Sequence, residues 1–386
     1  MGRFDDALAR PGLGAIAEIK RRSPSAGDLR PDADPSLIAP AYANAGAAAI
    51  SVLVDERFGG TWDDLHAARA ATAAPLLAKG FFSTEEDLRT ARAAGADAAL
   101  LLLRDLDDET TSRLLRFADD LGLDTLVEAH DANELERGIA LGARVLGVNA
   151  RDLATFEIDR RHQLELLARI PAGRIVIAES GVSTRAQGAA AELAGADAIL
   201  VGSALMRAPD PGAKLRELLR RPLVKVCGLT RDEDVAVAVE AGADLLGFVL
   251  VPDSPRAATA VLPTPDHVLS VAVWVDEPHE TIADLDQVHT SEPGAVRGRE
   301  AEILREGIQV ARLLDLPWQG TDPDHWRRAA EAEGRIVLAG KLGPETVAAA
   351  IATVRPWAVD AASSLESAPG IKDHTRVRAY VEAANR

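Results

Sequence analysis

Five short segments of this chain share one local pattern, and the pattern limits the folds that the chain can adopt. In each segment a helical pattern ends at a glycine, and a run of apolar residues follows directly. Glycine readily takes the left-handed conformation that ends a helix, and the run after it is typical of a strand buried on both faces. Neighbouring segments lie 47 to 53 residues apart, which fits two strand–helix units, and their glycines are Gly46, Gly95, Gly142, Gly195 and Gly242.

Further apolar runs supply the strands between these segments. Amphipathic stretches such as 84–94 and 133–141 separate the runs. Eight strands alternating with helices in about 220 residues predict a (β/α)8 barrel of the TIM type. An open doubly wound sheet is the alternative, although nothing in that fold limits the strands to eight. The predicted strands are 15–20, 50–54, 76–79, 98–103, 125–129, 145–149, 175–179 and 199–202.

A second series of strands begins after Arg221 and Pro222. The segment 276–315 leaves little room for full helices between its strands. The sequence therefore predicts an α/β protein of two consecutive (β/α)8 TIM-type barrels, the second abbreviated, with domains at residues 1–221 and 222–386. The seven strands predicted for the second barrel are 223–227, 245–250, 270–275, 286–289, 308–314, 335–340 and 357–360.

Charge and composition exclude several classes of function. The formal net charge of −17 argues against nucleic acid and anionic membranes as main partners. No apolar run approaches the roughly 18 residues that a membrane-spanning helix needs. The single cysteine, Cys227, excludes an internal disulfide, so we expect a cytoplasmic protein. The eight histidines lack metal-ligand spacing, and we expect neither a metal nor a cofactor.

Ionisable and polar residues gather at the predicted strand ends of the first barrel. In TIM barrels the active site lies at the carboxyl ends of the strands, and an unpaired buried charge costs several kcal/mol. We therefore predict that these side chains converge in one mouth, where lysines and glutamates suit proton transfer at a carbonyl or hydroxyl group. The alternative is that each is a surface residue just past its strand. The residues are Glu18, Lys20, Lys79, Glu128, Asn149, Arg151 and Glu179.

Glycine–serine pairs follow the last two predicted strands of the first barrel. Ser180–Gly181 and Gly202–Ser203 place backbone amides where such barrels commonly hold a phosphate. Ordinary turn formation is the alternative explanation for these glycines.

Longer motifs in the first half identify a family. With them, this half resembles indole-3-glycerol phosphate synthase over nearly its whole length. The matching segments, in order, are IAEIKRRSPS (16–25), FGGT (58–61), LAK (77–79), LVE (126–128), GVNARDL (147–153), AESG (178–181) and VGSALM (201–206).

The second half carries the motifs VKVCGLT (224–230), SPR (254–256) and DAASSLESAPGIKD (360–373). These resemble phosphoribosylanthranilate isomerase, and the order of the halves is that of fused, bifunctional enzymes of tryptophan biosynthesis. The resemblance implies that the isomerase half rearranges N-(5′-phosphoribosyl)anthranilate to 1-(2-carboxyphenylamino)-1-deoxyribulose 5-phosphate. The synthase half would then close that product to indole-3-glycerol phosphate, with loss of carbon dioxide and water.

Small phosphorylated anthranilate–sugar compounds would thus be the partners, and we expect a monomer. Two other interpretations stay open. In one, only the synthase is active and the C-terminal barrel is a decayed isomerase domain with a structural role. In the other, the chain is a non-catalytic module that binds a phosphosugar.

The resemblance also implies roles for residues of the synthase half. Lys79 would be the acid at the ketone oxygen, and Glu128 and Lys20 would assist dehydration. Lys20 and Arg151 would hold the anthranilate carboxylate. The orienting residues would be Asn149, Glu18 and Glu179, and the phosphate-binding residues Ser23, Ser180, Gly181, Gly202 and Ser203. Gly80 stands where the family usually has an aspartate.

In the isomerase half, Cys227 would be the base that removes a carbon-bound proton, and Asp315 the acid that opens the sugar ring. A small buried hydrophobe is the alternative for Cys227. Substrate contacts would come from Arg256 and His289, and phosphate contacts from Gly340, Lys341, Ser363 and Ser364.

Three departures from the isomerase family stand out in the sequence. The glycine-rich loop is reduced to 317–321, Lys341 and Ser364 replace glycines, and a strand, or the helix before it, is expected to be lost between His289 and Asp315.

Overall fold

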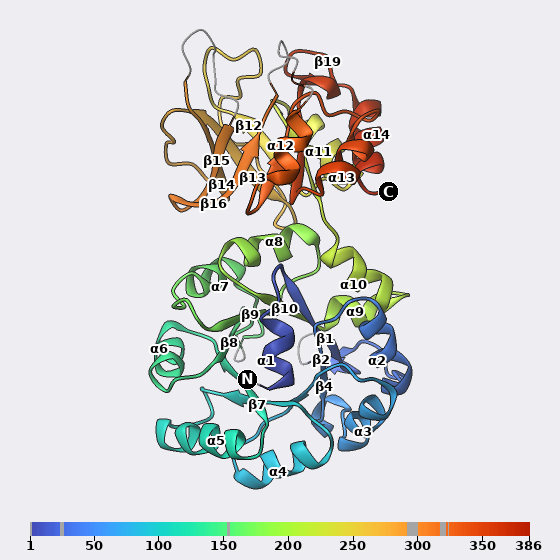
Figure 1. Cartoon of the computed structure of the whole chain (residues 1–386), viewed down its shortest axis with the longest axis vertical. Coiled ribbons are helices and arrows are strands. Elements are labelled where there is room, and N and C mark those ends of the chain that lie inside the picture. The colour runs from blue at the N-terminus through green and yellow to red at the C-terminus, as the bar shows by residue number, and fades with distance from the viewer. Residues whose placement is uncertain (1, 24–26, 153–154, 292–299, 317–321, 323) are drawn as a thin grey trace. The chain divides into compact units, whose positions relative to one another are not determined.

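The computed structural model describes residues 2–23, 27–152, 155–291, 300–316, 322 and 324–386 (Figure 1). Its contacts divide the chain into two compact units, Met1–Ser183 with Gly188–Leu219 and Thr184–Gln187 with Arg220–Arg386. The domain limits predicted from the sequence, 1–221 and 222–386, stay a prediction. Each unit contains one closed barrel.

Eight parallel strands close the first barrel, because β1 pairs with both β4 and β10. Each predicted strand is present with its ends displaced by at most one residue, which confirms the barrel and excludes the open sheet. The strands are β1 (Gly14–Ile19), β4 (Ala49–Leu53), β5 (Leu76–Lys79), β6 (Ala98–Leu102), β7 (Asp124–Ala129), β8 (Val145–Asn149), β9 (Ile175–Glu179) and β10 (Ala198–Val201).

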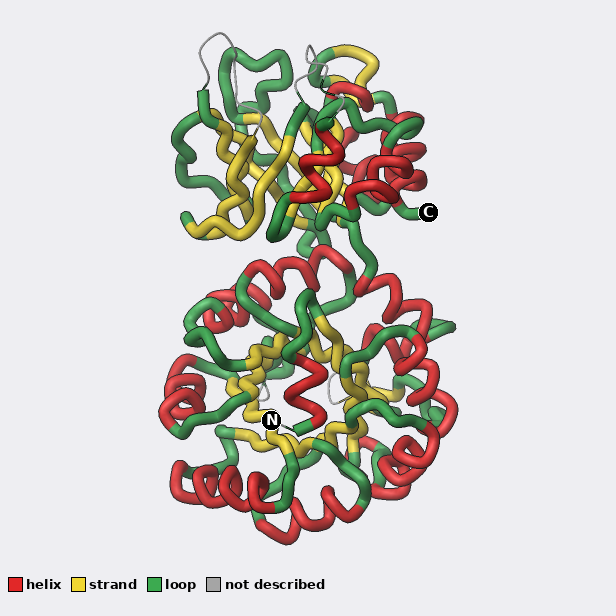
Figure 2. The backbone as a smooth tube through the Cα atoms, viewed as in Figure 1, coloured by secondary structure: helices red, strands yellow, loops and turns green. Residues whose placement is uncertain are grey.

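Helices surround these strands, as Figure 2 shows. Capping side chains begin several of them; Thr61 and Thr84, for example, each form a reciprocal capping box. The five glycines of the recurring pattern all have φ between 80° and 102°, as predicted for residues that end helices. The helices are α1 (Arg3–Leu8), α2 (Pro35–Asn44), α3 (Trp62–Ala71), α4 (Glu85–Ala93), α5 (Asp108–Asp120), α6 (Ala132–Ala140), α7 (Arg160–Leu167), α8 (Arg185–Leu193), α9 (Ser203–Arg207) and α10 (Pro211–Leu219).

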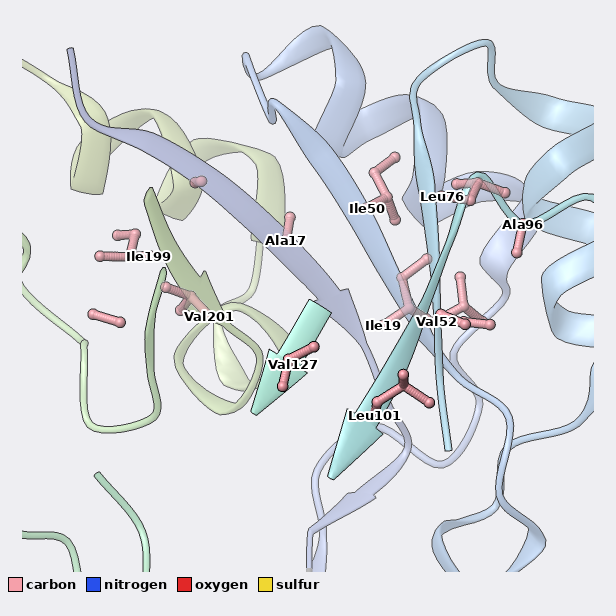
Figure 3. Packing of buried hydrophobic residues seen from close by; sticks show 14 of the residues in the cluster. Ala17, Ile19, Ile50, Val52, Leu76, Ala96, Leu101, Val127, Ile199 and Val201 are labelled. Atoms are coloured by element: carbon pink, nitrogen blue, oxygen red, sulfur yellow. The ribbon is translucent and has the colours of Figure 1, made fainter. Parts of the chain in front are cut away.

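Two buried clusters, one on each face of the strands, make up the core of the first barrel. The outer cluster joins the strands to the helices and includes Ile50, Leu101 and Val127 (Figure 3). The inner cluster includes Leu77 and Leu126, and Phe4 and Leu8 of α1 pack against it. Because successive strand residues face opposite sides, the inward-facing positions continue to the strand ends, where they are Glu18, Lys79, Glu128, Asn149 and Glu179.

The second barrel also has eight strands, of which seven were predicted. They are β11 (Leu223–Cys227), β12 (Leu245–Val249), β13 (Leu269–Val275), β14 (Leu285–His289), β15 (Glu300–Arg305), β16 (Ile308–Leu314), β17 (Ile336–Leu338) and β18 (Ala358–Ala361). The expectation that a strand is lost between His289 and Asp315 is wrong. β15 fills that place, although it runs antiparallel to both β14 and β16.

A two-residue turn joins β15 to β16. Glu306 and Gly307 both have positive φ, 50° and 76°, which makes a type I′ turn that suits the twist of a hairpin. Because one strand is reversed, β16 again runs parallel to β17, and the carboxyl ends of β11, β14 and β16 lie at the same end of the barrel.

Few helices accompany the second barrel, which is therefore abbreviated as predicted. Among the described residues, none lies between β12 and β16. The helices are α11 (Asp232–Ala241), α12 (His325–Glu331), α13 (Val347–Val354) and α14 (His374–Ala384). Two-stranded sheets add β2 (Arg22–Ser23) to β3 (Gly27–Asp28), and β19 (Glu366–Ala368) to β20 (Ile371–Lys372). No described helix has the length and apolar character to cross a membrane.

Candidate active sites

A cavity of about 390 Å³ opens at the carboxyl ends of the first barrel's strands. Glu179 does not line it, but its fully buried side chain contacts Lys79 from the barrel interior. The other residues predicted for this mouth all line the cavity: Glu18, Lys20, Ser23, Lys79, Glu128, Asn149, Arg151, Ser180, Gly181, Gly202 and Ser203. The predicted convergence of side chains from distant segments is therefore present.

Lys79 lies among three carboxylates. Its Nζ is 2.5 Å from Glu179 Oε2, 3.4 Å from Glu128 Oε2 and 3.8 Å from Glu18 Oε2. Burial by itself lowers the pKa of Lys79, but the three carboxylates outweigh burial and raise that pKa above its usual value. Lys79 is therefore an ammonium ion, able to donate a proton or a hydrogen bond to an oxygen that gains negative charge.

The environments of Glu128 and Glu179 push their pKa values apart. Burial raises the pKa of both groups, and the charge of Glu128 raises that of Glu179 further. For Glu128, Lys79, His130 and Asn149 outweigh burial and hold the pKa below its usual range. When two neighbouring carboxyl groups have separated pKa values, the group with the lower pKa can act as a base while the other keeps its proton.

Two glycines make room for these carboxylates. A Cβ atom added at Gly147 on β8 would fall on Oε1 of Glu179, and one added at Gly202 would fall on Oε1 of Glu18 and lie 2.8 Å from Lys20 Cε. The Glu18–Lys20 ion pair, with 2.6 Å between Oε1 and Nζ, thus depends on the missing side chain of Gly202. The sequence predicted Gly202 only as a phosphate contact, and the structure adds this steric role.

The cavity also has an aromatic wall that the sequence reasoning missed. Phe58, Phe81 and Phe156 line it, and the rings of Phe58 and Phe81 stack with their centroids 6.5 Å apart. Phe81 keeps 45% of its surface exposed, although it is a large apolar side chain. The three phenylalanines lie in the segments that follow three strand ends, where the sequence prediction named only polar residues and glycines. Exposed rings on one wall suit a flat aromatic ligand.

The cavity wall explains one departure from the synthase family. At Gly80, an added Cβ would lie 2.7 Å from Cε1 of Phe82 and 3.3 Å from Cγ2 of Val54. Phe82 in turn stacks on Trp62, with ring centroids 5.8 Å apart. A side chain at residue 80 therefore requires Phe82 to move.

The interior of the second barrel contains a buried cation. Lys225 Nζ lies 2.8 Å from Asp360 Oδ2 and 2.5 Å from Gln287 Oε1. Cys227, two residues further along β11, is buried and interacts electrostatically with Lys225. His289 is fully buried, with its Nε2 2.8 Å from Nε2 of Gln287.

The predicted base and acid of this barrel lie at one end of it. Cys227 ends β11, His289 ends β14, and the buried Asp315 directly follows β16. The cations Lys225 and Lys372 both interact electrostatically with Cys227.

Arg256, predicted to contact substrate, is held by a carboxylate. Its Nε and Nη2 lie 2.8 and 2.9 Å from the two oxygens of Glu366, and Lys372 Nζ is 3.0 Å from Oε1 of the same group. Glu366 therefore links Arg256 to Lys372 beside Cys227.

The predicted phosphate residues of the second barrel lie in two loops. Gly340 and Lys341 both have positive φ, 94° and 55°, so Lys341 keeps the glycine-like backbone despite its side chain. Ser364 donates its hydroxyl hydrogen to the carbonyl of Leu342, which joins the loops, and Ser363 is exposed. The shortened loop 317–321 lies outside the described residues.

Comparisons with known proteins show what each half of the chain is similar to. The family model "Indole-3-glycerol phosphate synthase" matches residues 2–218, and the model "N-(5'phosphoribosyl)anthranilate (PRA) isomerase" matches residues 319–383. The tryptophan biosynthesis protein TrpCF of Yersinia pestis is 36% identical over 95% of this chain and 84% of the relative. The chain belongs to the TrpCF family of tryptophan-biosynthesis proteins. The resemblance inferred from the motifs is confirmed for both halves of this TrpCF family member.

Other relatives match single halves. The indole-3-glycerol phosphate synthase of Mycobacterium ulcerans is 46% identical over 55% of this chain and 79% of the relative. The crystal structure of TrpF from Jonesia denitrificans is 28% identical and matches 43% of this chain and 97% of its own, with a TM-score of 0.34. Family models matching both halves do not favour the interpretation of the second half as a decayed isomerase domain.

Proposed function

We propose that this chain catalyses two consecutive steps of tryptophan biosynthesis, the isomerisation in the second barrel and the ring closure in the first. The observation that supports it most directly is Lys79, held among three glutamates in a cavity with an aromatic wall. The anthranilate ring of the substrate fits the aromatic wall. The carboxylate on that ring fits the cations of the rim, and the phosphate on the sugar fits the backbone amides.

In ring closure, a carbon of the anthranilate ring attacks the ketone carbon of the substrate. Lys79 donates a proton to the ketone oxygen as its negative charge develops, and carbon dioxide then leaves the ring. Loss of water completes the indole. Lys20 protonates the hydroxyl group that leaves, and Glu128 removes a second proton, the one that the new ring loses in the same step. Arg151 and Lys20 hold the carboxylate, while Glu18, Asn149 and Glu179 orient the acids and bases. The phosphate contacts are Ser23, Ser180, Gly181, Gly202 and Ser203.

In the isomerisation, Asp315 protonates the ring oxygen of the ribose, and the ring opens to an imine. Cys227, as a thiolate, then removes the proton from the adjacent carbon, and the resulting enol becomes the ketone. Arg256 and His289 contact the substrate. The phosphate contacts are Gly340, Lys341, Ser363 and Ser364.

Two single variants test this assignment. Lys79→Ala should remove ring closure and keep isomerisation, and Cys227→Ala should do the reverse. Both reactions are followed by fluorescence on the same intact preparation. Full ring closure by Lys79→Ala, or full isomerisation by Cys227→Ala, contradicts the assigned site. A wild-type chain that closes the ring but never isomerises favours a structural second barrel, and one that binds product without either reaction favours a binding module.

The proposal includes a monomer in the cytoplasm. Each predicted set of site residues comes from one barrel of one chain, so neither set requires a second copy. The single cysteine excludes internal disulfides, which agrees with a reducing compartment. Light scattering of the purified chain measures the oligomeric state, and a dimer mass contradicts this part.

A further inference from the structure

His130 lies one residue past β7, against Glu128, and the proposed mechanism gives it no role. Its Nε2 is 3.1 Å from Oε1 of Glu128, and its Nδ1 is 3.1 Å from Oε2 of Glu134. The backbone N–H of His130 donates to the same oxygen of Glu134, at 2.8 Å. The ring is therefore held between two carboxylates, one in the catalytic mouth and one on α6.

The start of α6 fixes this arrangement. Asp131 caps the helix by accepting a hydrogen bond from the backbone N–H of Glu134, at 2.8 Å. Glu134 thus occupies the first turn, and its carboxylate points back to the preceding residue, His130. The side chains of His130 and Glu134 are 13% and 14% exposed, whereas that of Glu128 is 2% exposed.

The two oxygens of Glu128 have different neighbours. Oε2 is 3.4 Å from Lys79, which also contacts Glu179 and Glu18. Oε1 accepts a hydrogen bond from Asn149 Nδ2 at 2.9 Å and faces His130. When Lys79 gives its proton to the substrate, it becomes neutral and no longer balances the charge of Glu128. His130, whose Nε2 is 3.1 Å from Oε1, then remains beside Glu128 as a cation.

The charge of His130 follows from its surroundings. Burial lowers the pKa of the ring, but Glu128 and Glu134 outweigh burial and raise it to about 9. The ring is cationic below that pH and neutral above it. The charged groups that face the ring or its partner are Glu128 of β7, Glu134 of α6, and, across the mouth, Lys79 of β5, Glu179 of β9 and Glu18 of β1.

We propose that His130, clamped by Glu134, is a positioning residue that keeps Glu128 ionised and its Oε1 fixed while Lys79 exchanges its proton. The inference rests on the proposed role of Glu128 as the base of the ring-closure reaction.

The test compares His130→Ala and His130→Gln with wild type in ring-closure kinetics across pH. We expect kcat to fall about 10- to 100-fold in His130→Ala, with KM changed less than about threefold, because Glu128 loses orientation and not substrate contacts. The acidic limb of kcat should move to higher pH, because Glu128 has lost a cation. His130→Gln keeps a donor near Oε1 and should recover part of kcat without moving the limb back.

Glu134→Gln tests the clamp. It removes one of the two carboxylates that raise the pKa of His130, so the alkaline limb of kcat that His130 sets should move to lower pH. His162→Ala, an exposed histidine on α7, is the matched control and should leave both limbs unchanged.

Circular dichroism of the same preparations, compared with wild type, reports whether the first barrel is folded. An unchanged pH profile and kcat in His130→Ala overturns the inference; if that variant does not fold, an unchanged alkaline limb in Glu134→Gln overturns it. Glu128→Gln separates this failure from failure of the proposed function. If Glu128→Gln keeps full ring closure, the proposed base is wrong. If it is inactive while the His130 variants behave like wild type, only the present inference fails.

Discussion

Lys79 can contact three glutamates only because glycines, Gly147 and Gly202, lie next to two of them. Glu128 on β7 pairs with Gly147 on β8, whereas Glu179 on β9 pairs with Asn149. The side chain of Glu179 reaches back over Gly147, so that its Oε1 lies where a Cβ at Gly147 would be. Any residue larger than glycine at position 147 displaces the Glu179 carboxylate from Lys79. The glycine–valine–asparagine segment of β8 is therefore as much a part of the site as the charged residues.

Gly147→Ala should reduce ring closure strongly, by about 100-fold in kcat/KM, because a shift of about 1 Å in a catalytic group costs that much. Steady-state kinetics measures the loss, and isomerisation by the same preparation should be unchanged. Gly188→Ala is the control, since its Cβ would meet only Leu13 and Ile199, at 3.4 and 3.7 Å. Equal loss in both glycine variants contradicts the steric explanation.

Lys341→Gly should stabilise the second barrel and weaken its substrate binding. Removing a side chain from a left-handed residue lowers the conformational free energy by about 1 kcal/mol, while loss of the ammonium group should raise the KM of isomerisation. Denaturant unfolding followed by tryptophan fluorescence is a suitable measure, because four of the five tryptophans lie after residue 222. Gly340→Ala should do the opposite for stability, since its Cβ would fall on Leu316. A lower unfolding free energy in Lys341→Gly contradicts the argument.

At the scale of elements, the first barrel was readable from the sequence because each strand is covered on both faces. Such strands form continuous apolar runs. Every second residue of a strand faces inward, so the inward-facing positions lead from Leu126 to Glu128 and from Leu77 to Lys79. The candidate mouth followed from the same counting.

The strand β15 escaped prediction for the converse reason. No described helix lies between β12 and β16, and along β15 only Ala301 and Ile303 are buried, alternating with exposed Glu300 and Glu302. An alternating pattern of four residues is short and resembles a polar loop. The role of His130 was also not predicted. This residue lies after the apolar run, and its contact with Glu134 depends on how α6 is capped.

The β15–β16 turn offers a stability test. Type I′ turns favour asparagine before glycine, because asparagine tolerates positive φ better than glutamate does. Glu306→Asn should therefore raise the unfolding free energy of the second barrel by about 0.5–1 kcal/mol. Tryptophan fluorescence during denaturant unfolding measures it. Gly307→Val should lower the same quantity, and equal stability of all three proteins contradicts the turn assignment.

At the scale of the whole molecule, each barrel carries its own predicted acid, base and phosphate contacts. A defect in one barrel should therefore leave the other intact. An equimolar mixture of Lys79→Ala and Cys227→Ala should convert N-(5′-phosphoribosyl)anthranilate to indole-3-glycerol phosphate, although neither variant does so alone. Chromatography of the product measures the conversion. No product from the mixture, with each single activity retained, contradicts independent sites.

The reversal of β15 has a consequence for how such a barrel can shrink. A strand that runs antiparallel to its predecessor must be followed by a second antiparallel pairing before the original strand direction returns, so crossover connections are lost in pairs. If only one crossover had been lost, every later strand would run in the reverse direction. Asp315 and Lys341 would then lie at the opposite end of the barrel from Cys227. An even number of deletions keeps the acid, the base and the phosphate loops on one rim.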